Sequence, residues 1–484
     1  MSVDIVIAGM PYVEGGEPLM APGYLKSIVE IEGFSAIGID LNVEFVNRIK
    51  GNRYYNELIG FATHGTITTQ DEANKKNAIE EIIKEVDHQA QRILSYNPKQ
   101  IGLSLLTAFA QGYTRWLCVR LKQLAPDIPI VVGGSGIREN LCDSGSYFCT
   151  ELLSYNLIDH FITGDGERAI IEYLKGNYNY PGIDSMDWQQ PDNLSDFPYP
   201  NYDDYDFSLY ETPSIPILDS QGCVRKCEFC DIIEYWKKFT YKESSYTFQE
   251  MLHQSKKYNV YNFSMRNSLT NGNMREFKKW VSLVAEHNRT QPANTQVSWQ
   301  GYFIIRNNEQ HPEDMWPEIR DSNGTLYLGV ETAIEKVRWE MGKKFKNEDI
   351  DYHLEMGKKY DVPLVMLMMG SNLGETREDY KFTQQWLQDR YQYAGKSVIG
   401  VWYTLAGILP NTAWDRKTDD DSISKSKHPY LWHETLGITE DERRLNLHVL
   451  IETAKPFNNF DSAISKTVNE MQSNLGDLIY DVTE

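Results

Sequence analysis

The sequence predicts an α/β protein of two domains, a doubly wound parallel sheet over residues 1–180 and a partial (β/α)6 barrel over 213–415. Short apolar runs alternate with helical stretches in both parts of the 484-residue chain. These runs are continuous in Ile, Val and Leu, as expected for parallel strands buried on both faces. A Pro-rich stretch over 181–212 separates the two parts and indicates a linker.

The first domain is expected to hold five buried strands joined by helices, in a Rossmann-like or flavodoxin-like arrangement. Several of the runs end in glycine, which is typical of a strand that turns tightly into a helix. The expected strands are Val3–Ala8, Ala36–Ile39, Ile101–Leu106, Ile130–Val132 and His160–Ile162.

The second domain repeats the β-then-α rhythm six times, too few in about 200 residues for the roughly 250 of a closed eightfold barrel. An open, TIM-like barrel is therefore predicted. A C-terminal extension, 416–484, is expected to be mostly helical, and Thr439–Glu442 indicates a capping box at the start of a helix. The expected barrel strands lie within 214–218, 261–265, 296–299, 326–330, 364–369 and 397–402.

Composition excludes several classes of protein. The net charge of −21 disfavours nucleic acid as the main partner, because phosphate backbones would be repelled. No run approaches the 18 apolar residues of a membrane span, and the N-terminus lacks a signal-peptide pattern. A cytoplasmic protein is expected, and the six cysteines are not expected to form a disulfide framework.

Three of the six cysteines form a Cys-x3-Cys-x2-Cys loop, Cys223, Cys227 and Cys230. Thiolates suit zinc or an iron–sulfur cluster. Structural zinc takes four ligands, whereas no cysteine follows Cys230. Three ligands on one loop favour a [4Fe–4S] cluster with one open iron. The loop follows the first barrel strand, at the end where the active sites of βα barrels lie.

This loop, with Phe229 before its last cysteine, resembles the signature of the radical S-adenosylmethionine (radical SAM) superfamily. The resemblance implies that Cys223, Cys227 and Cys230 ligate a [4Fe–4S] cluster whose unique iron chelates S-adenosylmethionine. One-electron reduction would then yield methionine and a 5′-deoxyadenosyl radical that abstracts a hydrogen atom. An external reductant such as flavodoxin or ferredoxin is also implied.

Segments downstream of the loop strengthen the resemblance. The family pattern places Phe229 beside the adenine, and Glu331, in Leu328–Thr332, would accept a hydrogen bond from S-adenosylmethionine. Gly370 and the turn Gly374–Thr376 resemble a family turn after the fifth strand that also contacts this cofactor. Met341-Gly342-Lys343 is family-like as well.

The first domain resembles the cobalamin-binding domain of one radical SAM subgroup, although the axial-histidine motif DxHxxG is absent. Glycines at a strand end let backbone N–H groups approach a ligand, but the same residues suit a tight turn without a ligand. The cobalamin-binding residues implied by the resemblance are Gly133, Gly134, Ser135, Gly136, Gly164 and Glu167.

These inferences predict an enzyme that uses a [4Fe–4S] cluster, S-adenosylmethionine and cobalamin to transfer a methyl group to an unactivated carbon of a small molecule or peptide. A cobalamin-free radical rearrangement, cyclisation or oxidation is the alternative within the family. A methylthiotransferase is disfavoured, because Cys118, Cys142 and Cys149 lie too late in the first domain to hold its second cluster. A non-catalytic iron–sulfur or zinc-binding protein is the alternative from another class. No motif identifies the substrate or the catalytic residues.

Overall fold

The chain folds into two compact units, residues 1–216 and 217–484, each described here by itself. The computed structural model describes residues 2–12, 16–64, 72–138, 140, 146–266, 268–394, 397–418, 423–425, 432–434 and 438–458.

The first unit is built on a parallel five-stranded sheet in the order β2-β1-β3-β4-β5. This is the flavodoxin-like order, in which the connections reverse direction between β1 and β3 and leave a crevice at the carboxyl ends of those strands. Its elements are β1 (Ile5–Gly9), α1 (Met20–Ile31), β2 (Ala36–Asp40), α2 (Leu41–Ile49), α3 (Tyr55–His64), α4 (Glu72–Leu94), β3 (Ile101–Ser104), α5 (Gln111–Leu124), β4 (Ile130–Gly133), α6 (Phe148–Ser154), β5 (His160–Ile162) and α7 (Gly166–Leu174).

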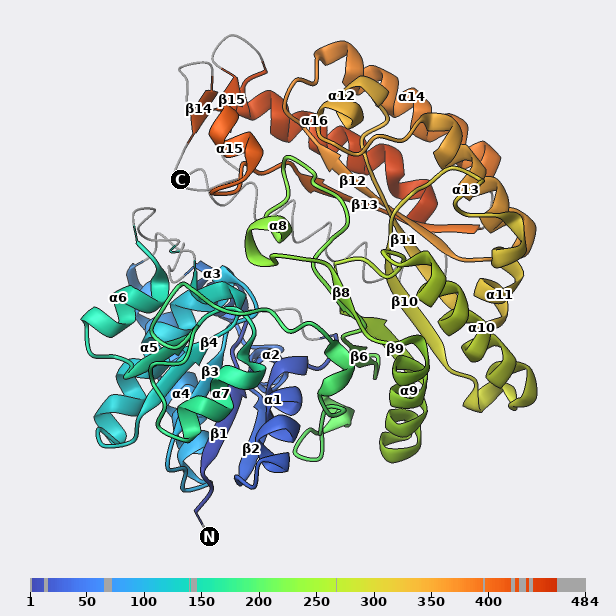
Figure 1. Ribbon diagram of the computed structural model, residues 1–484. Coiled ribbons are helices and arrows are strands. Elements are labelled where there is room, and N and C mark those ends of the chain that lie inside the picture. The colour runs from blue at the N-terminus through green and yellow to red at the C-terminus, as the bar shows by residue number, and fades with distance from the viewer. Residues whose placement is uncertain are drawn as a thin grey trace. The chain divides into compact units, whose positions relative to one another are not determined.

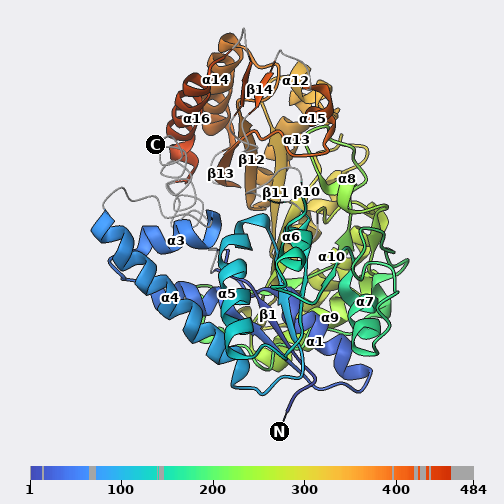
Figure 2. The same ribbon diagram turned by 90° about the vertical axis from the view of Figure 1, so that its left-hand side faces the viewer.

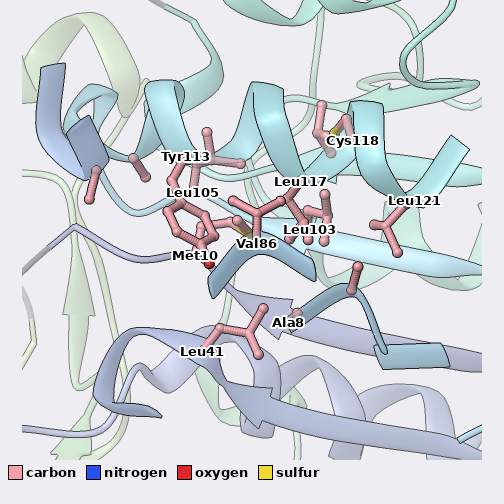
Figure 3. Close-up of a cluster of buried hydrophobic side chains, with 14 of the residues drawn as sticks. Ala8, Met10, Leu41, Val86, Leu103, Leu105, Tyr113, Leu117, Cys118 and Leu121 are labelled. Atoms are coloured by element: carbon pink, nitrogen blue, oxygen red, sulfur yellow. The ribbon is translucent and has the colours of Figure 1, made fainter. Parts of the chain in front are cut away.

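Side chains of successive strand residues enter two apolar cores, one on each face of this sheet. Val6 and Ala8 belong to a core formed with α2 to α6, whereas Ile5 and Ile7 belong to a core with α1 and α7. Figure 2 shows α4 and α5 on one face of the sheet and α1 and α7 on the other. Figure 3 shows Leu117 of α5 and Val86 of α4 meeting strand residues of the larger core. Burial on both faces explains the continuous apolar runs of the sequence.

The segment predicted as a linker packs on the first unit. Asp204 accepts a hydrogen bond from the backbone N–H of Gly38 at 3.0 Å, on the edge strand β2, and pairs with Lys26. The Tyr205 hydroxyl donates to the Leu19 carbonyl at 2.7 Å. These contacts occupy part of an edge that would otherwise expose unpaired backbone groups.

The second unit contains a six-stranded sheet in the order β13-β12-β11-β10-β9-β6, with β6 and β13 at its edges. Neighbouring strands from β9 to β13 are parallel. Figure 1 shows α10, α11, α13 and α14 along one face. The elements are β6 (Ile215–Ile217), β7 (Ser220–Gln221), α8 (Ile232–Tyr235), β8 (Thr240–Tyr241), α9 (Ser244–Tyr258), β9 (Asn262–Met265), α10 (Met274–Thr290), β10 (Ser298–Phe303), α11 (Trp316–Asp321), β11 (Gly324–Glu331), α12 (Glu335–Glu340), α13 (Asn347–Tyr360), β12 (Leu364–Gly370), α14 (Arg377–Ala394) and β13 (Val398–Leu405).

The C-terminal extension contributes α15 (Ala413–Lys417), a hairpin of β14 (Ile423–Lys425) and β15 (Trp432–Glu434), and α16 (Glu440–Ala454). Thr439 and Glu442 form the predicted capping box at the start of α16. The hairpin was not predicted from the sequence. No helix among the described residues is long and apolar enough to span a membrane.

Candidate functional site

The cysteine loop lies at the carboxyl end of β6 and is closed at its base by two short strands. Ser220 and Gln221 of β7 pair with Tyr241 and Thr240 of β8 in antiparallel fashion. Gly222 opens the loop with φ +77°, and a Cβ there would meet the Lys238 carbonyl oxygen at 2.5 Å. Only glycine combines this backbone conformation with so close an approach.

The three thiols of the loop are free, with Cys227 buried and Cys223 and Cys230 half-buried. The Cys230 backbone N–H donates to the Cys227 carbonyl at 3.1 Å, and the Arg225 N–H points at the Cys223 sulfur at 3.4 Å. Burial raises the pKa of Cys227, and it raises that of Cys230 to about 12. Within the described ranges, no three His, Cys, Asp or Glu side chains are arranged to hold a single metal ion.

The donor set of the loop fits a [4Fe–4S] cluster, because each of three thiolates then binds a different iron and the sulfurs need not converge on one ion. The ammonium group of Lys343 acts electrostatically on both Cys227 and Cys230. A fixed positive charge favours the thiolate form that a cluster requires. The three predicted ligands therefore share one loop beside the partly buried cation of Lys343.

Glu331 is the last residue of the fourth barrel strand, β11, and lies at a backbone irregularity. The β11–β12 register shifts between Gly329 and Glu331, and Glu331 has φ +69°. A bulge re-aims a side chain, and a non-glycine residue in the left-handed region costs about 1–3 kcal/mol. Such an outlier is typical of a position selected for function rather than for stability.

The re-aimed Glu331 carboxylate accepts a hydrogen bond from Lys343 Nζ at 2.5 Å. Burial lowers the pKa of Lys343, but Glu331 and the neighbouring Cys227 outweigh that effect and the pKa is raised overall. A Cβ on Gly329 would lie 2.9 Å from the Lys343 Nζ and 3.0 Å from Glu331 Oε1. The missing side chain at 329 leaves room for this ion pair.

Backbone contacts hold the cysteine loop against two distant segments. The Glu228 N–H donates to the Met341 carbonyl at 3.0 Å, and the Trp414 N–H donates to the Glu228 carbonyl at 3.0 Å. Gly342 has φ +85°, and a Cβ there would lie 2.9 Å from the Lys226 carbonyl oxygen. The family-like Met341-Gly342-Lys343 segment thus supports the loop and presents Lys343 to it.

Phe229 packs beside an apolar cluster next to the loop, formed by Val337, Met341, Ala406, Ile408, Trp414 and Trp432. Its ring lies 5.7 Å from that of Trp414, and Lys343 Nζ lies 5.8 Å from its centroid. Trp432 comes from the C-terminal extension, which therefore completes the wall of the site in this unit.

Gly370 ends β12, where its carbonyl accepts from the Ala406 N–H at 2.9 Å. A Cβ there would meet the Leu447 side chain at 2.9 Å, so packing against α16 is sufficient to explain this glycine. In the turn that follows, buried Glu375 accepts from the Thr332 hydroxyl at 2.6 Å and from the Asn372 N–H at 2.8 Å. Burial raises the pKa of Glu375 to about 7.

Lys343 and Glu375 are the site residues to which sequence reasoning gave no role. Both belong to segments recognised as family-like, and that was the available signal. Thr332 connects Glu375 to the chain next to Glu331, so the turn after β12 supports the bulge at the end of β11.

In the first unit, the predicted cobalamin residues fall into two groups. Gly134 and Ser135 are exposed at the end of β4, beside Leu106, which is 49% exposed after β3. An exposed apolar side chain next to accessible backbone amides fits the rim of a large, mostly apolar ring. Gly133 is half-buried at the same strand end.

The second group of predicted cobalamin residues is covered by the chain itself. A Cβ on Gly136 would lie 2.2 Å from the Thr107 carbonyl oxygen, and one on Gly164 would lie 2.0 Å from the Trp188 ring. Glu167 is buried in the first turn of α7. Loop packing therefore accounts for the glycines at 136 and 164 without a ligand, and it also accounts for Gly134, whose Cβ would lie 2.3 Å from the Leu105 carbonyl oxygen.

The remaining cysteines fit the structural role expected of them. Cys118 and Cys149 are buried and free, and burial raises the pKa of each to about 12. Such thiols are unreactive. Cys142 lies outside the described residues.

Comparison with known proteins finds a family that part of the second unit resembles. Residues 217–387 match the family model of the radical SAM superfamily. An uncharacterized methyltransferase, sll1242, from Synechocystis sp. (strain ATCC 27184 / PCC 6803 / Kazusa) is 25% identical over 291 residues, which cover 56% of this chain and 49% of that protein. The chain thus spans about half the length of this curated relative.

Solved structures resemble nearly the whole chain. The radical S-adenosylmethionine methyltransferase TsrM from Kitasatospora setae, with cobalamin and a [4Fe–4S] cluster bound, matches with a TM-score of 0.63 at 14% identity, covering 92% of this chain and 84% of that one. The cobalamin-dependent radical enzyme OxsB, with aqua-cobalamin and S-adenosylmethionine bound, matches with a TM-score of 0.66 at 13% identity, covering 99% and 71%. The α/β fold class predicted from the sequence is confirmed.

Proposed function

We propose that this chain, whose residues 217–387 form a radical SAM domain, reductively cleaves S-adenosylmethionine to a 5′-deoxyadenosyl radical and uses it in cobalamin-dependent methyl transfer. The observation that carries the proposal is the cysteine loop, whose free thiols lie beside the partly buried Lys343–Glu331 pair at the carboxyl end of the sheet. When bound, the cluster supplies the electron that breaks the sulfonium bond.

In this proposal the protein positions cofactors and excludes water. Cys223, Cys227 and Cys230 hold three irons of the cluster, and Phe229 with its apolar cluster covers the adenine side. Glu331, aimed by its bulge and by Lys343, accepts a hydrogen bond from S-adenosylmethionine. An external one-electron donor such as flavodoxin or ferredoxin supplies reducing equivalents. We place the enzyme in the cytoplasm, where thiols remain reduced.

Cobalamin would lie at the carboxyl ends of β3 and β4, on Leu106, Gly133, Gly134 and Ser135. The flavodoxin-like strand order supports this placement, because ligands of such sheets bind at the carboxyl ends near the switch point. When bound, cobalamin supplies the methyl group. A cobalamin-free radical reaction is the second candidate, favoured by the Trp188 ring over Gly164.

The test of cluster chemistry is anaerobic reconstitution with iron and sulfide, followed by iron analysis and a dithionite assay for 5′-deoxyadenosine. We expect Cys223→Ala, Cys227→Ala and Cys230→Ala each to abolish 5′-deoxyadenosine formation. Cys118→Ala removes a buried thiol far from the loop in sequence and serves as the matched control. Unchanged iron content in all three loop variants would contradict the proposal.

The test of cobalamin binding is retention of hydroxocobalamin through gel filtration, followed by its optical spectrum. Leu106→Glu is expected to reduce retention at least fivefold and to leave 5′-deoxyadenosine formation intact. Leu124→Glu is the control. Leu124 is also exposed, but it ends α5 near the amino ends of the strands, away from the proposed cobalamin site. No retention by the native chain would leave the radical SAM assignment standing and favour the cobalamin-free reaction.

A further inference from the structure

Arg306, which follows β10 at the carboxyl edge of the barrel sheet, has no acidic partner among the described residues. It is half-buried, and its Nε is buried without a hydrogen-bond acceptor. One guanidinium N–H reaches the Asn271 carbonyl, at the long distance of 3.5 Å. A guanidinium carries five N–H donors, so most of its hydrogen-bonding capacity is unused.

Several other cations of the same unit pair with carboxylates. Lys343 pairs with Glu331, and Lys242 pairs with Glu250 at 2.7 Å. Arg390 forms two bonds with the Asp351 carboxylate, at 2.9 and 3.0 Å. Against that background an unpaired, half-buried arginine calls for an anion that comes from outside the chain, because desolvating a lone charge is costly.

The backbone that carries Arg306 is held rigidly by a buried amide. Asn271 accepts from the Ile304 N–H at 2.8 Å and donates to the Ile304 carbonyl at 3.0 Å. Its amide also lies 3.0 Å from His311 Nε2, and His311 Nδ1 lies 2.8 Å from His353 Nε2. His353 Nδ1 completes the chain by donating to the Asp349 carbonyl at 2.7 Å.

This network fixes the loop after β9 to the loop after β10. Burial lowers the pKa of His311 to about 2 and that of His353 to about 4, so both rings are neutral near pH 7 and each link has one donor. A buried, fully directed network of this kind rigidifies the groups attached to it. Arg306 is therefore presented by a preorganised loop.

Arg306 lies near the cysteine loop, because Arg225 and Cys223 both act on it electrostatically. Burial lowers its pKa, the positive charge of Arg225 lowers it further, and the Cys223 thiol acts in the opposite direction. Arg225 is itself half-buried and, within the described part of the chain, has no carboxylate partner. Two like charges thus lie near each other beside the first predicted cluster ligand, in a chain whose net charge is −21.

We propose that Arg306, assisted by Arg225, binds a carboxylate group of the substrate and so positions it at the cysteine loop. A guanidinium forms two parallel hydrogen bonds with a carboxylate. The acidic balance of the chain favours a single carboxylate over a phosphate-rich ligand. The inference rests on the proposed function, which places the reaction at this loop, and it narrows the substrate to a carboxylic acid.

The test is equilibrium dialysis of the anaerobically reconstituted full chain against radiolabelled succinate, with S-adenosylmethionine present and ionic strength held constant with chloride. We expect saturable binding of one equivalent of succinate, weakened about tenfold in Arg306→Gln. Binding should be partly restored in Arg306→Lys, which keeps the positive charge but lacks the two parallel N–H donors of the guanidinium. Arg289→Gln is the control, since Arg289 pairs with Glu318 and Asp321 on the surface.

Several outcomes would overturn the inference. These are no saturable succinate binding by the native chain, equal binding in Arg306→Gln, displacement of S-adenosylmethionine by succinate, and tighter binding of inorganic phosphate than of succinate. A shifted cluster potential in Arg306→Gln with unchanged succinate binding would assign the arginine to the cluster alone. Dialysis needs no turnover, so these results are separate from a failure to form 5′-deoxyadenosine, which would contradict the proposed function.

Discussion

The carboxyl edges of the two sheets differ in how completely the protein satisfies its own groups. In the first unit, Asp40 at the end of β2 accepts four hydrogen bonds, from Leu19, Asn42, Val43 and Tyr210, and Trp188 covers Gly164. In the second unit, the edge retains three free thiols, a strained Glu331 and the unpaired Arg306. Groups that the fold leaves unsatisfied distinguish the edge with the proposed active site more clearly than glycine or charge patterns do.

The largest expected effect comes from removing the Lys343 cation at the carboxyl edge of the second unit's sheet. Lys343→Met leaves the buried Glu331 carboxylate unpaired, which costs about 3 kcal/mol of unfolding free energy. We expect 5′-deoxyadenosine formation to fall roughly a hundredfold or more, because Lys343 no longer holds the Glu331 carboxylate in position. Denaturant unfolding and the dithionite assay measure the two effects.

The double variant Lys343→Met/Glu331→Gln separates stability from chemistry in this pair. It removes both charges, so stability should recover while 5′-deoxyadenosine formation does not. Recovery of both would show that the pair is only structural and would remove the contrast between the two edges.

The next effect tests whether the first edge is closed by packing. Trp188→Ala removes a buried ring from Gly164 and should lower the unfolding free energy by about 3 kcal/mol. Trp116→Ala is the matched control, because Trp116 is 40% exposed and its loss should cost far less. Equal losses of unfolding free energy in the two variants would mean that packing of Trp188 on Gly164 does not stabilise this turn. Increased cobalamin retention in Trp188→Ala would mean that it blocks a ligand.

Glu375 provides a pH test of the second edge. Burial raises its pKa to about 7 from the ordinary value of 4.5, so the folded state holds this proton more tightly than the unfolded chain does. Stability should therefore fall as pH rises from about 4.5 to 7, by an amount on the order of 3 kcal/mol. Glu375→Gln should remove that part of the pH dependence, measured by urea unfolding across the range. An unchanged pH profile would contradict the assignment.

The smallest expected effect concerns the segment 181–212, which the sequence predicted to be a linker and which packs on the first unit. Tyr210 donates to the Asp40 carboxylate at 2.9 Å, and Tyr210→Phe should lower the unfolding free energy by about 1–2 kcal/mol. Tyr178→Phe, at a half-exposed ring, should change it by less than about 0.5 kcal/mol. If Tyr210→Phe cost as little as the control, the segment after residue 198 would not be integral to the first unit.

Sequence reasoning predicted the elements whose signals are local. Continuous Ile and Val runs anticipated strands such as β1 and β4, and Thr439 with Glu442 anticipated the cap of α16. The three-cysteine spacing anticipated the radical SAM domain. The hairpin β14–β15 was missed because its strands are only three residues each, too short to show a periodicity. Its partners become visible only in the folded chain.

The sequence by itself therefore determined the fold class, the position of the cysteine loop and the match of residues 217–387 to the radical SAM family model, because periodicity and spacing act between near neighbours. Tertiary structure alone decided that Lys343 meets Glu331, that Trp188 covers Gly164 and that Arg306 has no acidic partner among the residues that the structure describes. Each of these outcomes depends on residues separated along the chain meeting in a low-dielectric interior, where pairing or its absence dominates the free energy.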